Sequence, residues 1–482
     1  MASAEDFSPS QDPPMAKGNT NSGRSKATSF LSDGFLFVGG ALVAFLVVWA
    51  LWSFFSPPPP SSDTFSTAAF PDRKSAKFDN FATSSEAPES FLSTKCPTTA
   101  SASDPDPGHD PPDPTFYDDP NLTYTIDSPP VKNWDEKRRR WLEQHPSFAA
   151  AAEDRILIVT GSQATPCKNQ IGDYLLLKFF KNKVDYARRH GIDVFYNNVL
   201  LQPQMFSFWA KTPTVKAAML AHPEVEWIWW IDSDAAFTDM DFVLPLDRYK
   251  SHNLVIHGWP DMIFEKKSWT SINAGVFLIR NCQWAMEFMD AWSKMGPQAP
   301  QYDKWGQIQR SIFKDKSLPE SDDQTGLLYL IVEEQEKWGK KIYIERDYYF
   351  EGYWLEIVGT LENISENYAA VEKEAAAAAL RRRHAEKVGR AYGEVWAEVL
   401  KKKGVGYGRG SGRRPFITHF TGCQPCSGDH NQMYSGQTCF DAMQKALTFA
   451  DNQVLRDYGY VHPDLLDPAA VAPLPFDYPA SL

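Results

Sequence analysis

The sequence predicts an α/β fold in which helices flank a mainly parallel, mixed sheet. One observation is an alternation of strand-like apolar runs and helical patterns that begins at Arg155. A strand–helix–strand–helix–strand order implies parallel strands joined by right-handed crossovers. The other observation is the composition, because 43% hydrophobic and 23% charged residues are the proportions of an ordinary globular protein. These proportions exclude a fully disordered chain, a collagen and a polytopic membrane protein.

The predicted elements follow one another closely. Arg155–Gly161 (RILIVTG) is a β-rich apolar run, and apolar residues recur at helical spacing over Tyr174–His190. Asp193–Tyr196 is the next predicted strand, Trp209–Leu220 the next helix, and Glu226–Ile231 the third strand. In open sheets of this kind the ligand lies outside the carboxyl ends of the strands.

The N-terminal part of the chain predicts a membrane anchor. Gly34–Phe55 contains no charged residue, and as a helix it would be about 33 Å long, enough to cross a bilayer core of about 30 Å. A buried core helix or a cleaved signal peptide would also be apolar, but a signal peptide has a shorter apolar region and a small-residue cleavage site. Basic residues precede the run and only Asp63 follows closely, so we expect the N-terminus in the cytosol.

The domain organisation follows from this anchor. We expect a cytosolic tail at residues 1–33, a transmembrane signal-anchor helix at 34–55 and a disordered Pro/Ser/Asp-rich stem at 56–126. Residues 127–482 then form a luminal domain. The 49 Lys and Arg against 61 Asp and Glu give a net charge of −12, which argues against a nucleic-acid partner.

Sequons and cysteines agree with a secretory compartment. Asn121 and Asn363 each begin an N-glycosylation sequon. Cys423 and Cys426 form a C-x-x-C motif, which is also found in zinc and redox sites, but no second pair stands at zinc spacing. Disulfides are the expected use in a secretory lumen, with the connectivity left open among Cys167, Cys282, Cys423, Cys426 and Cys439.

Two carboxylates directly follow a strand that is apolar throughout. Trp227–Ile231 (WIWWI) predicts a strand buried on both faces, and Asp232, Ser233 and Asp234 come next. Carboxylates at this spacing suit Mn²⁺ or Mg²⁺, with a diphosphate completing the coordination. Such a metal would stabilise a departing nucleotide diphosphate. A solvent-facing turn or a helix N-cap would also explain a bare Asp-x-Asp.

Four further segments contain candidate ligand-binding residues. The loop Gly161-Ser162-Gln163 lies at the end of the first strand, where it would border a ligand or form an ordinary turn. Asp322-Asp323-Gln324 opens a predicted helix over Gly326–Trp338, either as substrate-binding residues or as a helix cap. Asn273 would hydrogen-bond a ligand hydroxyl or shape a turn. His419 is a candidate third metal ligand, although a lone His is more often structural.

These segments resemble the motifs of plant glycosyltransferase family 34. The similarity lies in WIWWIDSDAAFTDMDFVLPLDRYKSHNLVIHGW, INAGVFLIRNCQW, DDQ and THFTGCQPC, between about Arg155 and Pro463. The family contains xyloglucan 6-xylosyltransferases and galactomannan galactosyltransferases. The resemblance implies a GT-A-type nucleotide-sugar-binding fold, a type II Golgi membrane protein, a UDP-sugar donor and Mn²⁺. It also implies retaining α-1,6 transfer onto a β-1,4-linked polysaccharide acceptor.

The resemblance also implies residue roles by position. The metal ligands are Asp232, Asp234 and His419. The segment along the donor and acceptor sugars is Asp322, Asp323 and Gln324, with Asn273 beside the donor sugar. The donor-binding positions are Gly161, Ser162, Asp173, Asp232, Ser233, Gly422 and Gln424.

Two departures favour the galactomannan galactosyltransferase-like branch. Family xylosyltransferases typically have Lys in the GCxPC motif, where it helps to hold the diphosphate, and this chain has the neutral Gln424. Val371–Arg414 looks like an insertion, with 12 Lys and Arg against 5 Glu. We expect a solvated basic helix there, with a partner-binding surface as the alternative. Galactosyl transfer from UDP-galactose to mannan is the expected reaction, and xylosyl transfer from UDP-xylose to glucan is the alternative.

The expected mechanism places the acceptor 6-hydroxyl on the face from which UDP departs, with the leaving phosphate accepting its proton. In the alternative, Asp322 or Asp323 attacks the sugar and forms a covalent intermediate. Further hypotheses are a non-catalytic scaffold of a Golgi synthase complex, a lectin-like wall module, and a homo- or hetero-oligomer with other wall-polysaccharide enzymes. Candidate groove aromatics are Trp259, Trp269, Tyr349, Tyr353 and Trp354.

Overall fold

The computed structural model describes residues 119, 122–125, 129–374, 380, 385–386, 389–406 and 410–474. The expected cytosolic tail, the predicted span at 34–55, Asn121 and nearly all of the expected stem lie outside these residues. Within the described part of the chain, no helix combines the length and apolar character that crossing a bilayer requires.

A six-stranded mixed sheet forms the centre of the fold, in the order β2-β1-β3-β6-β5-β7. Its strands are β1 (Ile156–Gly161), β2 (Asp193–Asn197), β3 (Trp227–Ile231), β5 (Leu254–Gly258), β6 (Ile272–Arg280) and β7 (Ile342–Glu345). Strands β2, β1 and β3 are parallel, which confirms the predicted parallel pairing. Strand β6 runs antiparallel to β3 and β5, and β7 is parallel to β5.

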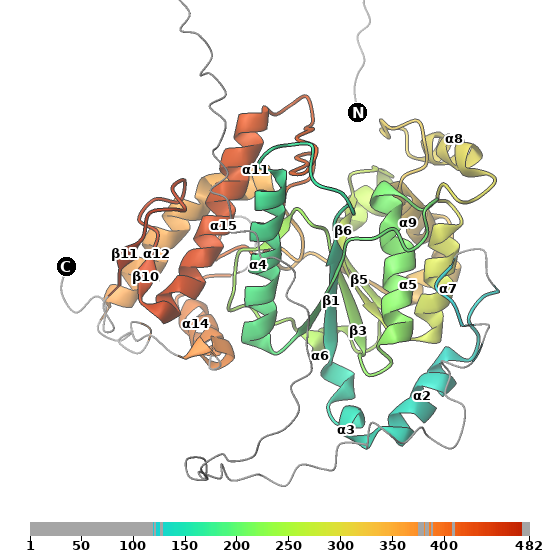
Figure 1. Ribbon diagram of the computed structural model, residues 1–482, viewed down its shortest axis with the longest axis horizontal. Coiled ribbons are helices and arrows are strands. Elements are labelled where there is room, and N and C mark those ends of the chain that lie inside the picture. Colours follow the sequence, from blue (N-terminus) through green and yellow to red (C-terminus); the bar gives the residue numbers. More distant parts are fainter. Residues whose placement is uncertain are drawn as a thin grey trace, which may run out of the picture. The chain divides into compact units, whose positions relative to one another are not determined.

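Helices cover both faces of this sheet (Figure 1). Helix α4 (Gly172–His190) covers one face, and α5 (Lys211–Ala221), α7 (Gln283–Ser293) and α9 (Asp323–Val332) cover the other. Alternate residues of β3 enter the two cores: Ile228 packs on the α5 side and Trp229 on the α4 side. All five β3 residues are buried, as the continuous apolar run predicts.

A second, three-stranded sheet brings the C-terminal part of the chain to the end of β3. It has the order β4-β9-β8, with β4 (Ala235–Phe237), β9 (Ile417–His419) and β8 (Gly352–Tyr353). Strand β4 follows β3 after three residues and pairs antiparallel with β9. Helix α15 (Gly436–Tyr458) packs along α4 (Figure 1). Residues 180 or more positions apart thus meet beside the strand end.

The predicted insertion is more than a solvated helix. A third core cluster, separate from the two on the faces of β3, includes Phe179 of α4 and Leu447 of α15. Helix α12 (Leu361–Lys373) and helix α14 (Gly389–Lys402) contribute to it. Trp396 and Leu400 of α14 are 3% and 4% exposed. The expectation of a solvated helix is therefore wrong for one face of α14, because that face supplies core side chains.

The remaining elements are short or peripheral. The other helices are α2 (Trp134–Gln144), α3 (Pro146–Ala149), α6 (Leu246–Tyr249), α8 (Tyr302–Ile312), α10 (Gln335–Trp338) and α11 (Trp354–Ile357). The short 3-10 turns are η2 (Ala152–Asp154), η3 (Ser207–Ala210), η5 (Gly339–Lys341) and η6 (Val358–Thr360), and η4 (Asp261–Glu265) is a π-helix. Strands β10 (Tyr460–Val461) and β11 (Ala472–Pro473) form a hairpin-like pair. The helix predicted over Gly326–Trp338 is divided into α9 and α10.

Candidate active site

A cleft of about 700 Å³ opens at the carboxyl ends of β1, β2 and β3. This is the position that the parallel-sheet prediction indicates. The predicted site residues that line it are Gly161, Ser162, Asp232, Ser233, Asp234 and Gln424. Ser162 is held at the floor, where its hydroxyl accepts a hydrogen bond from Tyr196 at 2.8 Å.

The two aspartates and the histidine meet at the end of β3. Oxygens of Asp232 and Asp234 and a ring nitrogen of His419 all lie within 4.8 Å of one another. His419 Nε2 is 3.3 Å from Asp234 Oδ1 and 3.9 Å from Asp232 Oδ2. Pairing of Ala235 with His419 across β4 and β9 sets this geometry. The backbone N–H of Asp232 also donates to Gly275 O on β6 at 2.8 Å.

The donor set fits a divalent cation. Two carboxylates and an imidazole are ligands of Mn²⁺ and related metals. Glu351 lies behind the histidine, with its Oε1 3.2 Å from His419 Nδ1, as carboxylates commonly do behind ligating histidines. Burial lowers the pKa of His419, but the Asp234 carboxylate outweighs it and the pKa rises to about 10. The imidazole therefore holds a proton whose place a cation can take.

A buried lysine links this cluster to the DDQ segment. Lys211 of α5 is 3% exposed, and its Nζ lies 2.7 Å from Asp323 Oδ2 and 3.4 Å from Asp232 Oδ1. The Trp230 indole N–H donates to the same Asp232 oxygen at 2.6 Å. With Oδ1 engaged in this way, Asp232 presents Oδ2 to the histidine.

The three DDQ residues have different surroundings. Asp322 is the N-cap of α9, accepting from Thr325 N at 2.8 Å, and it also pairs with buried Lys316 at 2.5 Å. Burial raises the pKa of Asp323 to about 6, although Lys211 opposes the shift. Gln324 donates to Trp269 O at 2.9 Å, between α9 and the loop before β6.

Asn273 lies next to the metal-binding cluster on β6. Its Oδ1 accepts from Gly275 N at 2.6 Å and its Nδ2 donates to Thr421 Oγ1 at 3.2 Å. Gly275 is the close neighbour of the cluster: a Cβ there would lie 2.3 Å from His419 Cε1 and 2.7 Å from Asp232 Oδ2. A glycine is therefore required at this approach.

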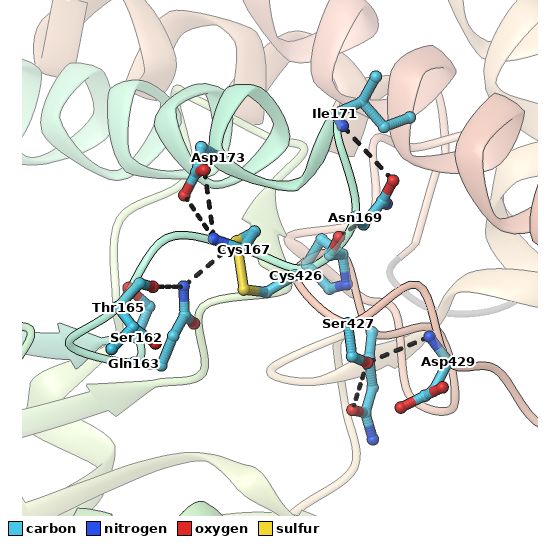
Figure 2. The surroundings of a disulfide bond; sticks show 12 residues. Ser162, Gln163, Thr165, Cys167, Asn169, Ile171, Asp173, Cys426, Ser427 and Asp429 are labelled. Atoms are coloured by element: carbon cyan, nitrogen blue, oxygen red, sulfur yellow. Dashed lines mark hydrogen bonds between the residues drawn. A yellow bond between two sulfur atoms is a disulfide. The ribbon is translucent and has the colours of Figure 1, made fainter.

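Two predicted donor-binding residues do not line the cleft. Asp173 accepts hydrogen bonds from Cys167 N at 3.2–3.3 Å, at the first turn of α4 (Figure 2). Gly422 forms a left-handed turn with φ +83°. Asp173 thus holds the loop before α4, and Gly422 lies in the loop after β9. Other residues of both loops line the cleft. Ser233, by contrast, lines the cleft, and its carbonyl accepts from buried Lys183 at 3.3 Å.

The two cysteines of the C-x-x-C motif belong to different disulfides. Cys167 pairs with Cys426, as Figure 2 shows, and Cys423 pairs with Cys439. Within the described residues Cys282 is free. This pairing confirms the expected disulfides and does not support the zinc or redox interpretation.

The predicted aromatic groove is only partly exposed. Trp259 is 43% exposed, whereas Trp354 is buried in the third core cluster. Trp269, Tyr349 and Tyr353 are partly buried. Asn363 is exposed on α12.

Four residues that matter to this site were not among the predicted ones. Lys183, Lys211, Gly275 and Glu351 hold the metal-binding loop or its ligands. Lys211 lies in the helix predicted over Trp209–Leu220, but the sequence does not distinguish it from Lys216 in the same helix. Glu351 has no sequence signal either, because its contact with His419 depends on β8 lying beside β9.

Comparison with known proteins assigns the family. The model of the galactosyl transferase GMA12/MNN10 family, glycosyltransferase family 34, matches residues 152–430. The chain is 55% identical to galactomannan galactosyltransferase 1 of Cyamopsis tetragonoloba, over 95% of this chain and 99% of that protein. It is 54% identical to glycosyltransferase 6 of Arabidopsis thaliana, over 96% and 99% of the two chains. It is 42% identical to "Probable xyloglucan 6-xylosyltransferase 3" of Arabidopsis thaliana, over 76% and 72%. The chain therefore belongs to glycosyltransferase family 34 and is a transferase enzyme.

Proposed function

We propose that this enzyme transfers galactose from UDP-galactose, in α-1,6 linkage and with retention, to a β-1,4-linked mannan. The observation that carries the proposal is the cluster of Asp232, Asp234 and His419 at the edge of the cleft. A cleft beside two carboxylates and an imidazole suits a nucleotide diphosphate bound with Mn²⁺ or Mg²⁺. The order and directions of the strands, with the acid pair at the carboxyl end of β3, support a GT-A-type fold.

The choice of galactose rests on similarity and on one residue. The chain shares 55% identity with a galactomannan galactosyltransferase over nearly its whole length, against 42% over a shorter stretch with the xyloglucan-related protein. Gln424 lines the cleft, at the position where the family resemblance implies a lysine in xylosyltransferases. Both observations favour galactosyl transfer.

The residues of the chain position the reaction partners. A divalent cation held by Asp232, Asp234 and His419 would neutralise charge on the departing diphosphate. Trp230 and Lys211 fix the orientation of Asp232, and Glu351 fixes that of His419. The carbonyl of Trp269 accepts from Gln324 of the DDQ segment, and Trp259 is exposed. Sugar rings of the acceptor would stack on these aromatic side chains.

The surroundings of the acidic residues support departure and attack on the same face of the sugar. A covalent intermediate needs a carboxylate that reaches the sugar. Asp322 is buried and paired with Lys316, and Asp323 is buried and paired with Lys211. In the same-face mechanism the leaving phosphate takes the proton of the acceptor hydroxyl, so neither carboxylate has to leave its partner.

A Golgi location, with the catalytic domain in the lumen, completes the proposal. Two disulfides and an exposed sequon asparagine suit an oxidising secretory compartment. The apolar run at 34–55 would supply the anchor.

A paired assay tests the proposal. The purified chain, with Mn²⁺, is offered UDP-galactose with mannan oligomers and UDP-xylose with glucan oligomers. We expect galactosylated mannan, and we expect Asp232→Ala to abolish it while Asp193→Ala, an exposed aspartate at the start of β2, retains it. Xylosylated glucan alone would overturn the sugar assignment. Absence of turnover with every pair would favour a scaffold, and retained activity in Asp232→Ala would overturn the metal site.

A further inference from the structure

We propose that Lys168 binds the diphosphate of the sugar nucleotide and supplies the positive charge that Gln424 lacks. The inference rests on the proposed nucleotide-diphosphate donor. It goes beyond that proposal because it assigns the charge to a residue on a different segment of the cleft lining, in the loop between β1 and α4.

The charges along the cleft require such a cation. Its lining contains two acidic residues, Asp232 and Asp234, and two basic ones, Lys168 and Lys211. A divalent ion balances the two aspartates, so the negative charge of a bound diphosphate needs a further partner. Charge-assisted hydrogen bonds from lysine are a common way to provide it.

Lys211 is not available to the diphosphate, because it already pairs with acidic residues. Its side chain is 3% exposed and its Nζ contacts Asp323, Asp232 and the carbonyl of Ala274. If Lys211 turned towards a diphosphate, Asp323 would remain buried without its counter-charge, which is costly. Lys168, in contrast, is exposed, and its side chain makes no hydrogen bond or ion pair with the rest of the described chain.

The backbone on both sides of Lys168 is anchored. Cys167 forms the disulfide with Cys426, and its N–H donates to Asp173 (Figure 2). Asn169 N donates to Cys426 O at 2.9 Å and Asn169 Nδ2 to Pro425 O at 3.0 Å. The loop is thus fixed before a ligand arrives, and less conformational entropy is lost on binding.

The anchoring also joins two segments of the cleft lining. The segment that Cys167 and Asn169 contact contains Gln424, Pro425 and Cys426, which line the same cleft as Lys168. Gln424 accepts from Ser427 Oγ at 3.1 Å and carries no charge. A lysine at position 168 or at position 424 would therefore face the same cleft, and we expect its charge to be interchangeable between the two positions.

Binding of UDP and of uridine to the full-length protein tests this assignment. With Mn²⁺ present, we expect Lys168→Met to weaken UDP binding about tenfold or more, because a charge-assisted contact is lost. Uridine binding should not change, since uridine has no phosphate. The control Lys294→Met, at an exposed lysine after α7, should match wild type for both ligands. Lys168→Arg should retain most of the UDP affinity.

Charge relocation gives the sharper test. Adding Gln424→Lys to Lys168→Met should restore UDP affinity and lower the KM for UDP-galactose towards the wild-type value. Equal UDP affinity in Lys168→Met and wild type would overturn the inference while leaving the proposed function intact, provided that Asp232→Ala still loses binding. Equal losses of UDP and uridine would overturn it too, because they would indicate a role in loop shape. If wild type itself bound no UDP, the proposed function would fail and this inference with it.

Discussion

At the scale of single residues, the side chains packed against the metal-binding cluster limit which amino acids fit at the neighbouring positions. Gly275 supplies the carbonyl that accepts from Asp232 N, and its missing side chain makes room for His419. Lys211 and Trp230 hold one oxygen of Asp232 and leave the other for the histidine. The ligand atoms are therefore preorganised by neighbours that are not ligands themselves.

Replacing Gly275 by Ala tests this crowding. The new Cβ would displace His419 or Asp232, and a displacement of about 1 Å at a reacting centre costs on the order of 100-fold in rate. We expect this loss in sugar transfer, together with weaker Mn²⁺ binding, from a chain that still folds. Gly359→Ala is the matched control, because nothing lies within 4 Å of a Cβ there. Wild-type activity and Mn²⁺ affinity in Gly275→Ala would refute the assignment.

The buried carboxyl of Asp239, in the loop after β4, should make the unfolding free energy depend on pH. Burial raises the pKa of this carboxyl to about 6, Arg414 opposes the shift and Asp241 adds to it. The folded chain therefore holds this proton at pH values where the unfolded chain, in which the carboxyl has its ordinary pKa of 3.8, has released it. Relative to Asp239→Asn, the unfolding free energy of wild type should fall by about 2 kcal/mol between pH 4 and pH 7.

Urea unfolding between pH 4 and pH 7 measures this difference. Asn keeps an acceptor for the Asp241 N–H, so the comparison isolates the charge. Asp193→Asn, at an exposed position, should follow the wild-type profile. Parallel profiles for wild type and Asp239→Asn would contradict the prediction.

At the scale of elements, strand pairing and helix packing bring distant segments to the site and into the core. The pairing of β4 with β9 places His419 beside Asp234. Helix α14 of the basic insertion packs Trp396 against Tyr368, with ring centroids 4.6 Å apart. Arg414 lies over the Tyr368 ring and pairs with Asp241 at 3.0 Å, which ties the end of the insertion to the loop after β4.

Trp396→Ala tests whether α14 contributes to stability. Removing a buried indole leaves a cavity, and such substitutions cost about 3–5 kcal/mol of unfolding free energy. Val395→Ala on the same helix is the control, because Val395 is 43% exposed and should change stability by less than about 0.5 kcal/mol. A similar small effect for Trp396→Ala would support the solvated-helix interpretation.

At the scale of the whole molecule, the chain combines a folded enzyme with an N-terminal apolar run that lies outside the described residues. If this run is a signal anchor, the full-length chain should remain in the membrane pellet after carbonate extraction, and its luminal part should resist added protease. Deleting residues 34–55 should release the protein into the soluble fraction. Extraction of the full-length chain by carbonate would contradict the anchor.

Much of this molecule was predictable because its patterns are local. The apolar run of β3, the carboxylates after it and the alternating helices of the parallel half are read directly from neighbouring residues. The motif order identified the family, which the comparisons confirm. The pairing of Cys167 with Cys426, across 259 positions, was not predictable because spacing alone does not determine connectivity.

The sequence by itself determined the chemistry that is available: two carboxylates at the end of a buried strand, a histidine near the C-terminus and a loop after the first strand. The tertiary structure alone decided which of these side chains meet. It placed His419 against Asp234, committed Lys211 to Asp323 and made Asp322 a helix cap rather than an open carboxylate. The physical reason is that these contacts join residues far apart along the chain, so they depend on strand pairing and helix packing and not on local spacing.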